Sequence, residues 1–86
     1  MLGLSSKQRI RSGVDSIRVG AIFGRTLPDN VVEKARVVNL GKGPSGIPHV
    51  FFHLSFERSN RPIGDTEPRT LALRAFVERF PEPIAS

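Results

Sequence analysis

Two histidines and a phenylalanine are the residues of this chain whose types and spacing come closest to a chemical site. His49, Phe51 and His53 occupy alternate positions of residues 47–56, a segment with three phenylalanines and alternating apolar residues that is typical of a strand. Two histidines that share a zinc ion each lie about 2.1 Å from it. Four residues of strand span about 13 Å, so these two rings cannot bind one ion within the strand. We therefore predict no metal site.

The same spacing would allow Phe51, flanked by the two histidines, to stack on unpaired bases. Alternation places all three rings on one face, opposite an apolar set that starts at Val50. An exposed aromatic ring stacks on a base with about 1–3 kcal/mol, and Lys34 and Arg36 on the neighbouring predicted strand would add contacts to phosphate. In the alternative interpretation, Phe51 belongs to a second hydrophobic layer under the C-terminal helix or the N-terminal arm.

Enzymatic chemistry finds no support in the motifs. The chain has no cysteine and no Gly-x-Ser-x-Gly segment. Asp65 and Glu67 lie among turn-forming residues, where a capping role is simplest. Lys42 follows a glycine, but a phosphate-binding loop needs another spacing and a following helix, whereas a strand follows here. We predict a protein that is not an enzyme and has no cofactor, although Lys42 could meet a phosphate.

The positive charge of the chain is concentrated near its N-terminus. Five basic residues against one acidic residue give residues 1–25 a charge of +4, whereas residues 26–86 contribute +1 to the net charge of +5. Such an arm could neutralise phosphates of nucleic acid or anionic lipid headgroups. It could equally be a solvated leader that keeps the protein soluble.

Residues 1–18 are predicted to form this arm, either flexible or as a short helix. Ser5 and Gln8 match a capping box, and Ile10, Val14 and Ile17 follow at helical spacing. The composition also fits a mitochondrial transit peptide. Because no signal-peptide core or membrane-spanning run is visible, we expect a cytoplasmic protein.

The elements that must position these residues are mainly strands. Residues 19–83 are predicted to form a single small β-rich domain, which without disulfides depends on the packing of its aliphatic and phenylalanine side chains. The fold class is mainly β, a small SH3-like barrel or a strongly bent antiparallel sheet with a short C-terminal helix; the alternative is α+β. Strands are predicted at 19–24, 31–40, 47–56 and 69–73, with a glycine-rich hairpin loop at 41–46 and a polar loop at 57–68. A helix of about two turns then ends before Pro81, the alternative being one helix over 67–80.

Three segments carry a resemblance to a known fold. ARVV (35–38), GIPHVFF (46–52) and RTLAL (69–73), in the order strand, glycine turn, long strand, polar loop, strand and helix, resemble small SH3-like barrels of uncharacterised bacterial families. The resemblance covers about residues 19–80 and implies a small barrel that serves as a binding module. Fold likeness by itself does not transfer function.

The hypothesis that follows is a non-enzymatic binding module for an anionic partner, with RNA or DNA favoured. A protein–protein interaction module or a small homodimer is the alternative. The candidate nucleic-acid-binding residues are Lys7, Arg9, Arg11, Arg18, Lys34, Arg36, Lys42 and Phe51.

Overall fold

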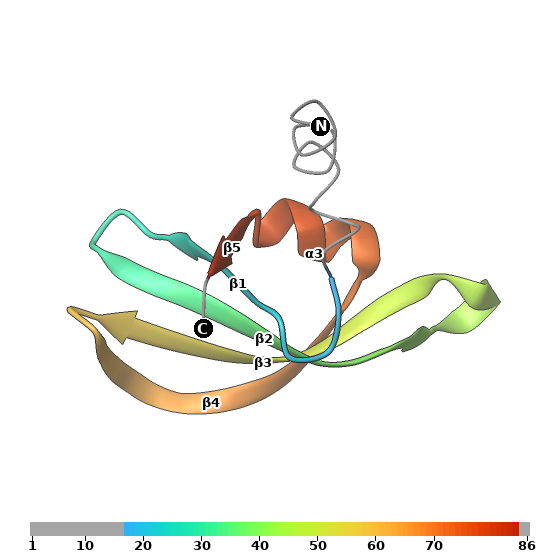
Figure 1. Cartoon of the computed structure of the whole chain (residues 1–86), viewed down its shortest axis with the longest axis horizontal. Coiled ribbons are helices and arrows are strands. Elements are labelled where there is room, and N and C mark those ends of the chain that lie inside the picture. Colours follow the sequence, from blue (N-terminus) through green and yellow to red (C-terminus); the bar gives the residue numbers. More distant parts are fainter. Residues whose placement is uncertain (1–16, 85–86) are drawn as a thin grey trace, which may run out of the picture.

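One antiparallel sheet of five strands bends around a short helix (Figure 1). The computed structural model describes residues 17–84. Its elements are β1 (Ile22–Thr26), β2 (Val31–Lys42), the 3-10 turn η1 (Pro44–Gly46), β3 (Pro48–Arg58), β4 (Arg61–Ala72), α3 (Leu73–Arg79) and β5 (Glu82–Ile84). The strand order β4-β3-β2-β1-β5 leaves β4 and β5 as edges. The predicted mainly-β fold with a strongly bent sheet and a short C-terminal helix is confirmed, whereas the sheet does not close into the barrel that the resemblance implied.

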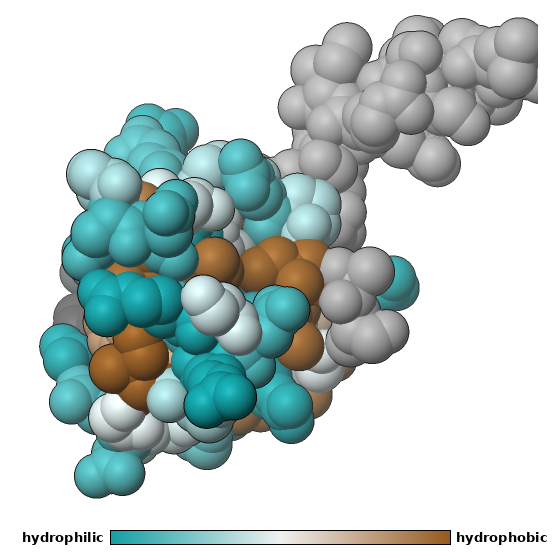
Figure 2. Space-filling view, turned by 90° about the vertical axis from the view of Figure 1, so that its left-hand side faces the viewer, coloured by the Kyte–Doolittle hydropathy of each residue, from teal (hydrophilic) through white to brown (hydrophobic). Residues whose placement is uncertain are grey.

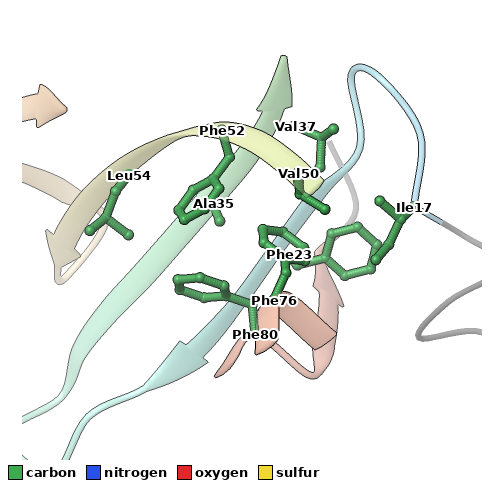
Figure 3. Close-up of a cluster of buried hydrophobic side chains, with 9 residues drawn as sticks. All are labelled: Ile17, Phe23, Ala35, Val37, Val50, Phe52, Leu54, Phe76 and Phe80. Carbon is green, nitrogen blue, oxygen red and sulfur yellow. The ribbon is translucent and has the colours of Figure 1, made fainter. Parts of the chain in front are cut away.

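The core lies between α3 and the concave side of the sheet (Figures 1 and 3). Phe76 on α3 and Phe80 directly after it project toward Phe52 on β3, with ring centroids 5.0 and 5.4 Å from it in edge-on arrangements. Alternation along β3 buries Val50 and Leu54 on the same face, as its sequence pattern predicts. Helix α3 therefore covers one face of the sheet, and no helix of residues 17–84 covers the other face.

The predicted loop at 57–68 is wrong, because most of this segment belongs to the long strand β4. Ser59 and Asn60 form a two-residue turn with φ of 53° and 64°, and Arg58 pairs with Arg61 across it. Positive φ at both central positions is the geometry that suits the twist of a tight hairpin. The two prolines of this segment suggested a loop, but prolines are tolerated on an edge strand.

The backbone nitrogen of Pro62 also suits an edge strand. Pairs that flank a two-residue turn exchange backbone hydrogen bonds, and the bonded pairs then alternate along the ladder. Pro62, next to the bonded pair of Arg61, therefore stands where its nitrogen points outward, whereas Pro68 pairs with His53 beyond a bulge. Pro62 removes an N–H that a further strand would need, so this part of the β4 edge resists pairing with another chain.

The end of the chain follows the strand-then-helix prediction, with one element added. β4 passes directly into α3 at Leu73, so a single helix over 67–80 is not formed. Beyond Pro81 the chain forms β5, which pairs with β1 and was not predicted. The first strand begins at Ile22 because residues 18–21 form a turn, in which the Ala21 N–H donates to the Arg18 carbonyl at 3.0 Å.

Within residues 17–84 one charged side chain is buried, that of Glu33 on β2. Arg25 donates to it at 2.7 Å and Arg79 at 3.0 Å. Burial by itself raises the pKa of Glu33, but the hydrogen bonds and charges of Arg79 and Arg25 together outweigh burial and lower that pKa from its ordinary value of 4.5. The ion pair joins the end of α3 to the sheet.

Candidate functional site

The face of β2, β3 and β4 that lies opposite α3 collects most of the candidate residues that the structure describes. Antiparallel partners point to the same side of a sheet, so the register defines this outer face. Arg36 pairs with His53, Phe51 pairs with Asn39, and His49 pairs with Gly41. The outer face therefore consists of Lys34, Arg36, Asn39 and Gly41 on β2, His49, Phe51, His53 and Ser55 on β3, and Pro68 and Thr70 on β4.

Two glycines make room for rings on this face. A Cβ atom at Gly41 would lie 3.3 Å from Cε1 of Phe51, and one at Gly43 would lie 2.5 Å from Cε1 of His49. The His49 ring is also held by a hydrogen bond of 2.8 Å between its Nδ1 and the Ile47 carbonyl. From the sequence, these glycines are predicted to form part of a hairpin loop at 41–46. Their close approach to the rings is a contact that no sequence pattern revealed.

Phe51 is partly buried on the outer face, among polar neighbours. Its cross-strand partners are Asn39 on β2 and Thr70 on β4. One alternative placed Phe51 in a hydrophobic layer under the C-terminal helix. Because α3 packs on the opposite face, the helix does not cover the Phe51 ring. The ring has its neighbours His49 and His53 two residues away on each side.

The two basic residues of the outer face differ in their partners. Lys34 donates to Glu57 at 3.1 Å, and both side chains are partly buried. Arg36 is exposed and forms no ion pair with an acidic residue of the described part of the chain. Arg36 is therefore the cation of this face that is available to a ligand.

A hollow of about 370 Å³ opens beside this arginine. It is lined by Arg36, His53, Ser55 and Thr66. Thr66 belongs to the stretch of β4 that bulges between Ile63 and Glu67. Sequence reasoning missed Thr66 because the segment was assigned to a loop. The hollow places hydroxyl, imidazole and guanidinium groups around one opening, a set that can donate hydrogen bonds to phosphate or to base edges.

The other candidate residues are not brought to this face. Lys42 is exposed near the end of the β2–β3 hairpin, but it pairs with Pro48, one step beyond the pair of Gly41, and so faces the opposite side. Arg18 is exposed in the turn before β1. Lys7, Arg9 and Arg11 lie outside the described residues.

Other kinds of site can be tested on the described residues. Across 17–84, no group of three or more His, Cys, Asp or Glu side chains is arranged to hold a metal ion. None of the helices in that range has the length and apolar character needed to cross a membrane. The end of the molecule that carries the β1–β2 and β3–β4 turns is mostly hydrophilic, with smaller hydrophobic areas between (Figure 2).

Residues 17–84 form an open, strongly bent antiparallel sheet around a short helix. The outer face of this sheet carries the rings of His49, Phe51 and His53. In comparisons with protein-family models, curated proteins and solved structures, the chain matches none of them. The function must therefore be argued from the outer face itself.

Proposed function

We propose that this protein is a non-enzymatic binding module for single-stranded nucleic acid, RNA or DNA, and that the outer face is its binding surface. The observation that supports the proposal is the row of three flat rings, His49, Phe51 and His53, at alternate positions of one strand. Alternate residues of a strand lie about 6.7 Å apart. Neighbouring bases of an extended nucleic-acid strand can be separated by the same interval, so that each base stacks on its own ring.

Charge supports the same assignment. The Arg36 guanidinium stands beside His53 in the register, so a phosphate that follows a base stacked on His53 would lie within its reach. Arginine is always charged and binds phosphate with several donors. The basic arm, with Lys7, Arg9 and Arg11, would add phosphate contacts that do not depend on sequence.

Single strands fit this face better than duplexes. In a duplex the bases are paired and stacked on one another, so their flat faces are not available to protein rings. Hydroxyl and amide side chains around Phe51, those of Asn39 and Thr70, can bond to the edges of an unpaired base. We therefore expect single strands to bind more tightly than duplexes of the same length.

A protein partner or a second copy of the chain is the rival proposal, and the hairpin favours it. Leu40 and Ile47 near the end of the β2–β3 hairpin are 42% and 49% exposed. In Figure 1 this hairpin extends away from α3. Sedimentation equilibrium distinguishes the two proposals, since a tight dimer would support the rival.

The test is a titration of the full chain against labelled oligonucleotides of about 12 nucleotides, a length that several rings can engage. At ~50 mM salt, fluorescence anisotropy should show binding to oligo-U or oligo-dT and weaker binding to a duplex. Phe51→Leu keeps an apolar contact to Gly41 but removes the flat ring, and should weaken binding about tenfold. Arg36→Ala should also weaken binding.

Arg74→Ala is the matched control for Arg36→Ala. Arg74 is exposed on α3, away from the outer face, so this variant removes the same charge from the opposite side. It should change affinity much less than Arg36→Ala does. No binding at ~50 mM salt, or equal losses in the two arginine variants, would refute the outer face as the site.

A further inference from the structure

A second hollow lies on the other side of the sheet, between β4 and the end of α3. It has a volume of about 110 Å³ and opens on the side of α3; of its lining residues, Thr70 also belongs to the outer face. Its lining is apolar at Phe52, Leu54, Leu71 and Phe80 and polar at Arg69, Thr70 and Arg79. The hollow is a consequence of the open sheet, because β4 and β5 do not meet and α3 fills only part of the concave side.

The floor of this hollow is the hydrophobic core itself. Phe52 and Phe80 are each 2% exposed, and Leu54 is 6% exposed. Phe80 packs on Phe52 with ring centroids 5.4 Å apart, which gives the floor a fixed shape (Figure 3). A ligand that enters the hollow therefore meets a preformed but small apolar surface, and burial of its own apolar atoms adds a modest favourable contribution to binding.

Two guanidinium groups lie at the hollow, from two different elements. Arg69 on β4 and Arg79 at the end of α3 are about half exposed, at 54% and 46%. Each has one acidic partner, Glu67 for Arg69 and Glu33 for Arg79. A guanidinium carries five N–H donors, so both keep donors for a ligand. Arg79 also lies over the Phe80 ring, 5.6 Å from its centroid, which holds the cation beside the apolar floor.

The net charge of the two ion-pair groups at the hollow suits a monoanion. Three arginines and two glutamates form the two ion-pair groups, which leaves one positive charge; they are Arg25, Arg69, Arg79, Glu33 and Glu67. One carboxylate neutralises that excess, whereas a phosphate dianion would exceed it. A planar carboxylate also matches the fork of a guanidinium.

We propose that this hollow binds a small monocarboxylate with a compact apolar group, its carboxylate between Arg69 and Arg79 and its apolar group against Phe80. The volume is somewhat smaller than the ~150 Å³ of a cavity known to accept benzene, so a branched alkyl group or part of a phenyl ring fits. A free small acid and the C-terminal residue of a peptide share this chemistry. The site does not depend on nucleic-acid binding at the outer face.

The experiment is a titration of amide shifts of the full chain with 4-methylpentanoate, which joins a carboxylate to an isobutyl group. Saturable shifts should centre on Leu71, Arg79 and Phe80, which line the hollow but are not part of the outer face. The Kd should be on the order of 1 mM for a ligand of this size. The amide of the same acid lacks the charge and acetate lacks the apolar group, so both should bind more weakly. A pentapeptide that ends in leucine tests the second source; shifts at the same residues would extend the site to peptide termini.

Arg69→Gln should weaken binding of 4-methylpentanoate about tenfold, because a charged hydrogen-bond donor is lost. Its partner Glu67 is exposed, so this variant should remain folded. Arg61→Gln, on the same strand but outside the lining, removes the same charge and should leave binding unchanged. Absence of saturable shifts with the acid, or equal binding by wild type and Arg69→Gln, would overturn the proposal. Neither outcome would bear on the separate proposal that oligonucleotides bind at the outer face.

Discussion

The carboxylate of Glu33 and the guanidinium of Arg79 lie 3.0 Å apart although 46 residues separate them in the chain. Glu33 is on β2 and its side chain is 3% exposed, whereas Arg79 is the last residue of α3. The contact joins the helix to the middle of the sheet, beside the hydrophobic core. It also makes the free energy of unfolding depend on pH.

Glu33→Gln should lower the free energy of unfolding at pH 7 by about 1–3 kcal/mol, because two charged hydrogen bonds are weakened while the half-exposed arginines stay hydrated. The folded state lowers the pKa of Glu33, so its carboxylate stabilises the fold at pH values above its ordinary value of 4.5. That stabilisation is lost as the pH falls through the folded-state pKa. Urea denaturation between pH 7 and about pH 3 should therefore show a smaller loss in the variant than in the wild type.

Glu67→Gln is the control for this prediction. Its ion pair with Arg69 is exposed on both sides, at 55% and 54%, and exposed pairs contribute about 0–1 kcal/mol. If the two variants had the same stability at pH 7, Glu33 would not be the residue that joins α3 to the sheet.

The hairpin between β3 and β4 predicts a stabilising substitution. Asn60 has a φ of 64°, where glycine has no steric cost, and the turn has positive φ at both central residues. Asn60→Gly should raise the free energy of unfolding by about 0.5–1 kcal/mol. Asn39→Gly makes the same change within β2, where it should destabilise because glycine weakens a strand and the Leu40 N–H loses its bond to the Asn39 side chain. Thermal denaturation of both variants should therefore show Tm changes of opposite sign, and a lower Tm for Asn60→Gly would contradict the assigned turn.

The sequence predicted those parts of the fold that depend on local interactions. Alternation along β3 identified Val50, Phe52 and Leu54 as core residues, because a two-residue period depends only on the strand itself. β4 was missed because Pro62 and Pro68 are acceptable only if their strand is an edge, and strand order is a property of the whole sheet. β5 has only three residues, too few for a period, and forms because β1 offers it a free edge.

The candidate site was predicted in part for the same reason. Phe51 and Arg36 share the outer face as alternation requires, and the pairing of Arg36 with His53 brings the row of rings beside a cation. Lys42 is separated from the row by a bulge in β2 between Val37 and Asn39, which shifts the alternation of the residues that follow. No sequence pattern marks such a bulge.

Two glycines of the β2–β3 hairpin allow the ring row to be tested without changing a ring. Gly43→Ala would place a Cβ 2.5 Å from the His49 ring, which must move and lose its bond to the Ile47 carbonyl. Because that ring is partly exposed and can move, stability should fall by less than about 1 kcal/mol, while affinity for oligo-U falls several-fold.

Gly46→Ala gives the opposite combination. No atom lies within 4 Å of its added Cβ, but its φ of 74° is unfavourable for alanine. This variant should lose about 1–2 kcal/mol of stability and keep its affinity for oligo-U. Equal affinities of the Gly43→Ala variant and the wild type would mean that the position of the His49 ring does not matter for binding.

The salt dependence of binding tests the basic arm. Each phosphate contact to a single strand contributes about 0.7 to the slope of log K against log salt. Replacing Lys7, Arg9 and Arg11 together by Ala should therefore reduce the slope by about 2 if all three contact phosphates. The matched control replaces Arg58, Arg61 and Arg74, three exposed arginines that lie outside the outer face, and removes the same net charge. Anisotropy titrations from ~50 to ~200 mM salt would measure both slopes. A slope that stays the same in the arm variant, or falls equally in the control, would assign the arm a role in solubility rather than in binding.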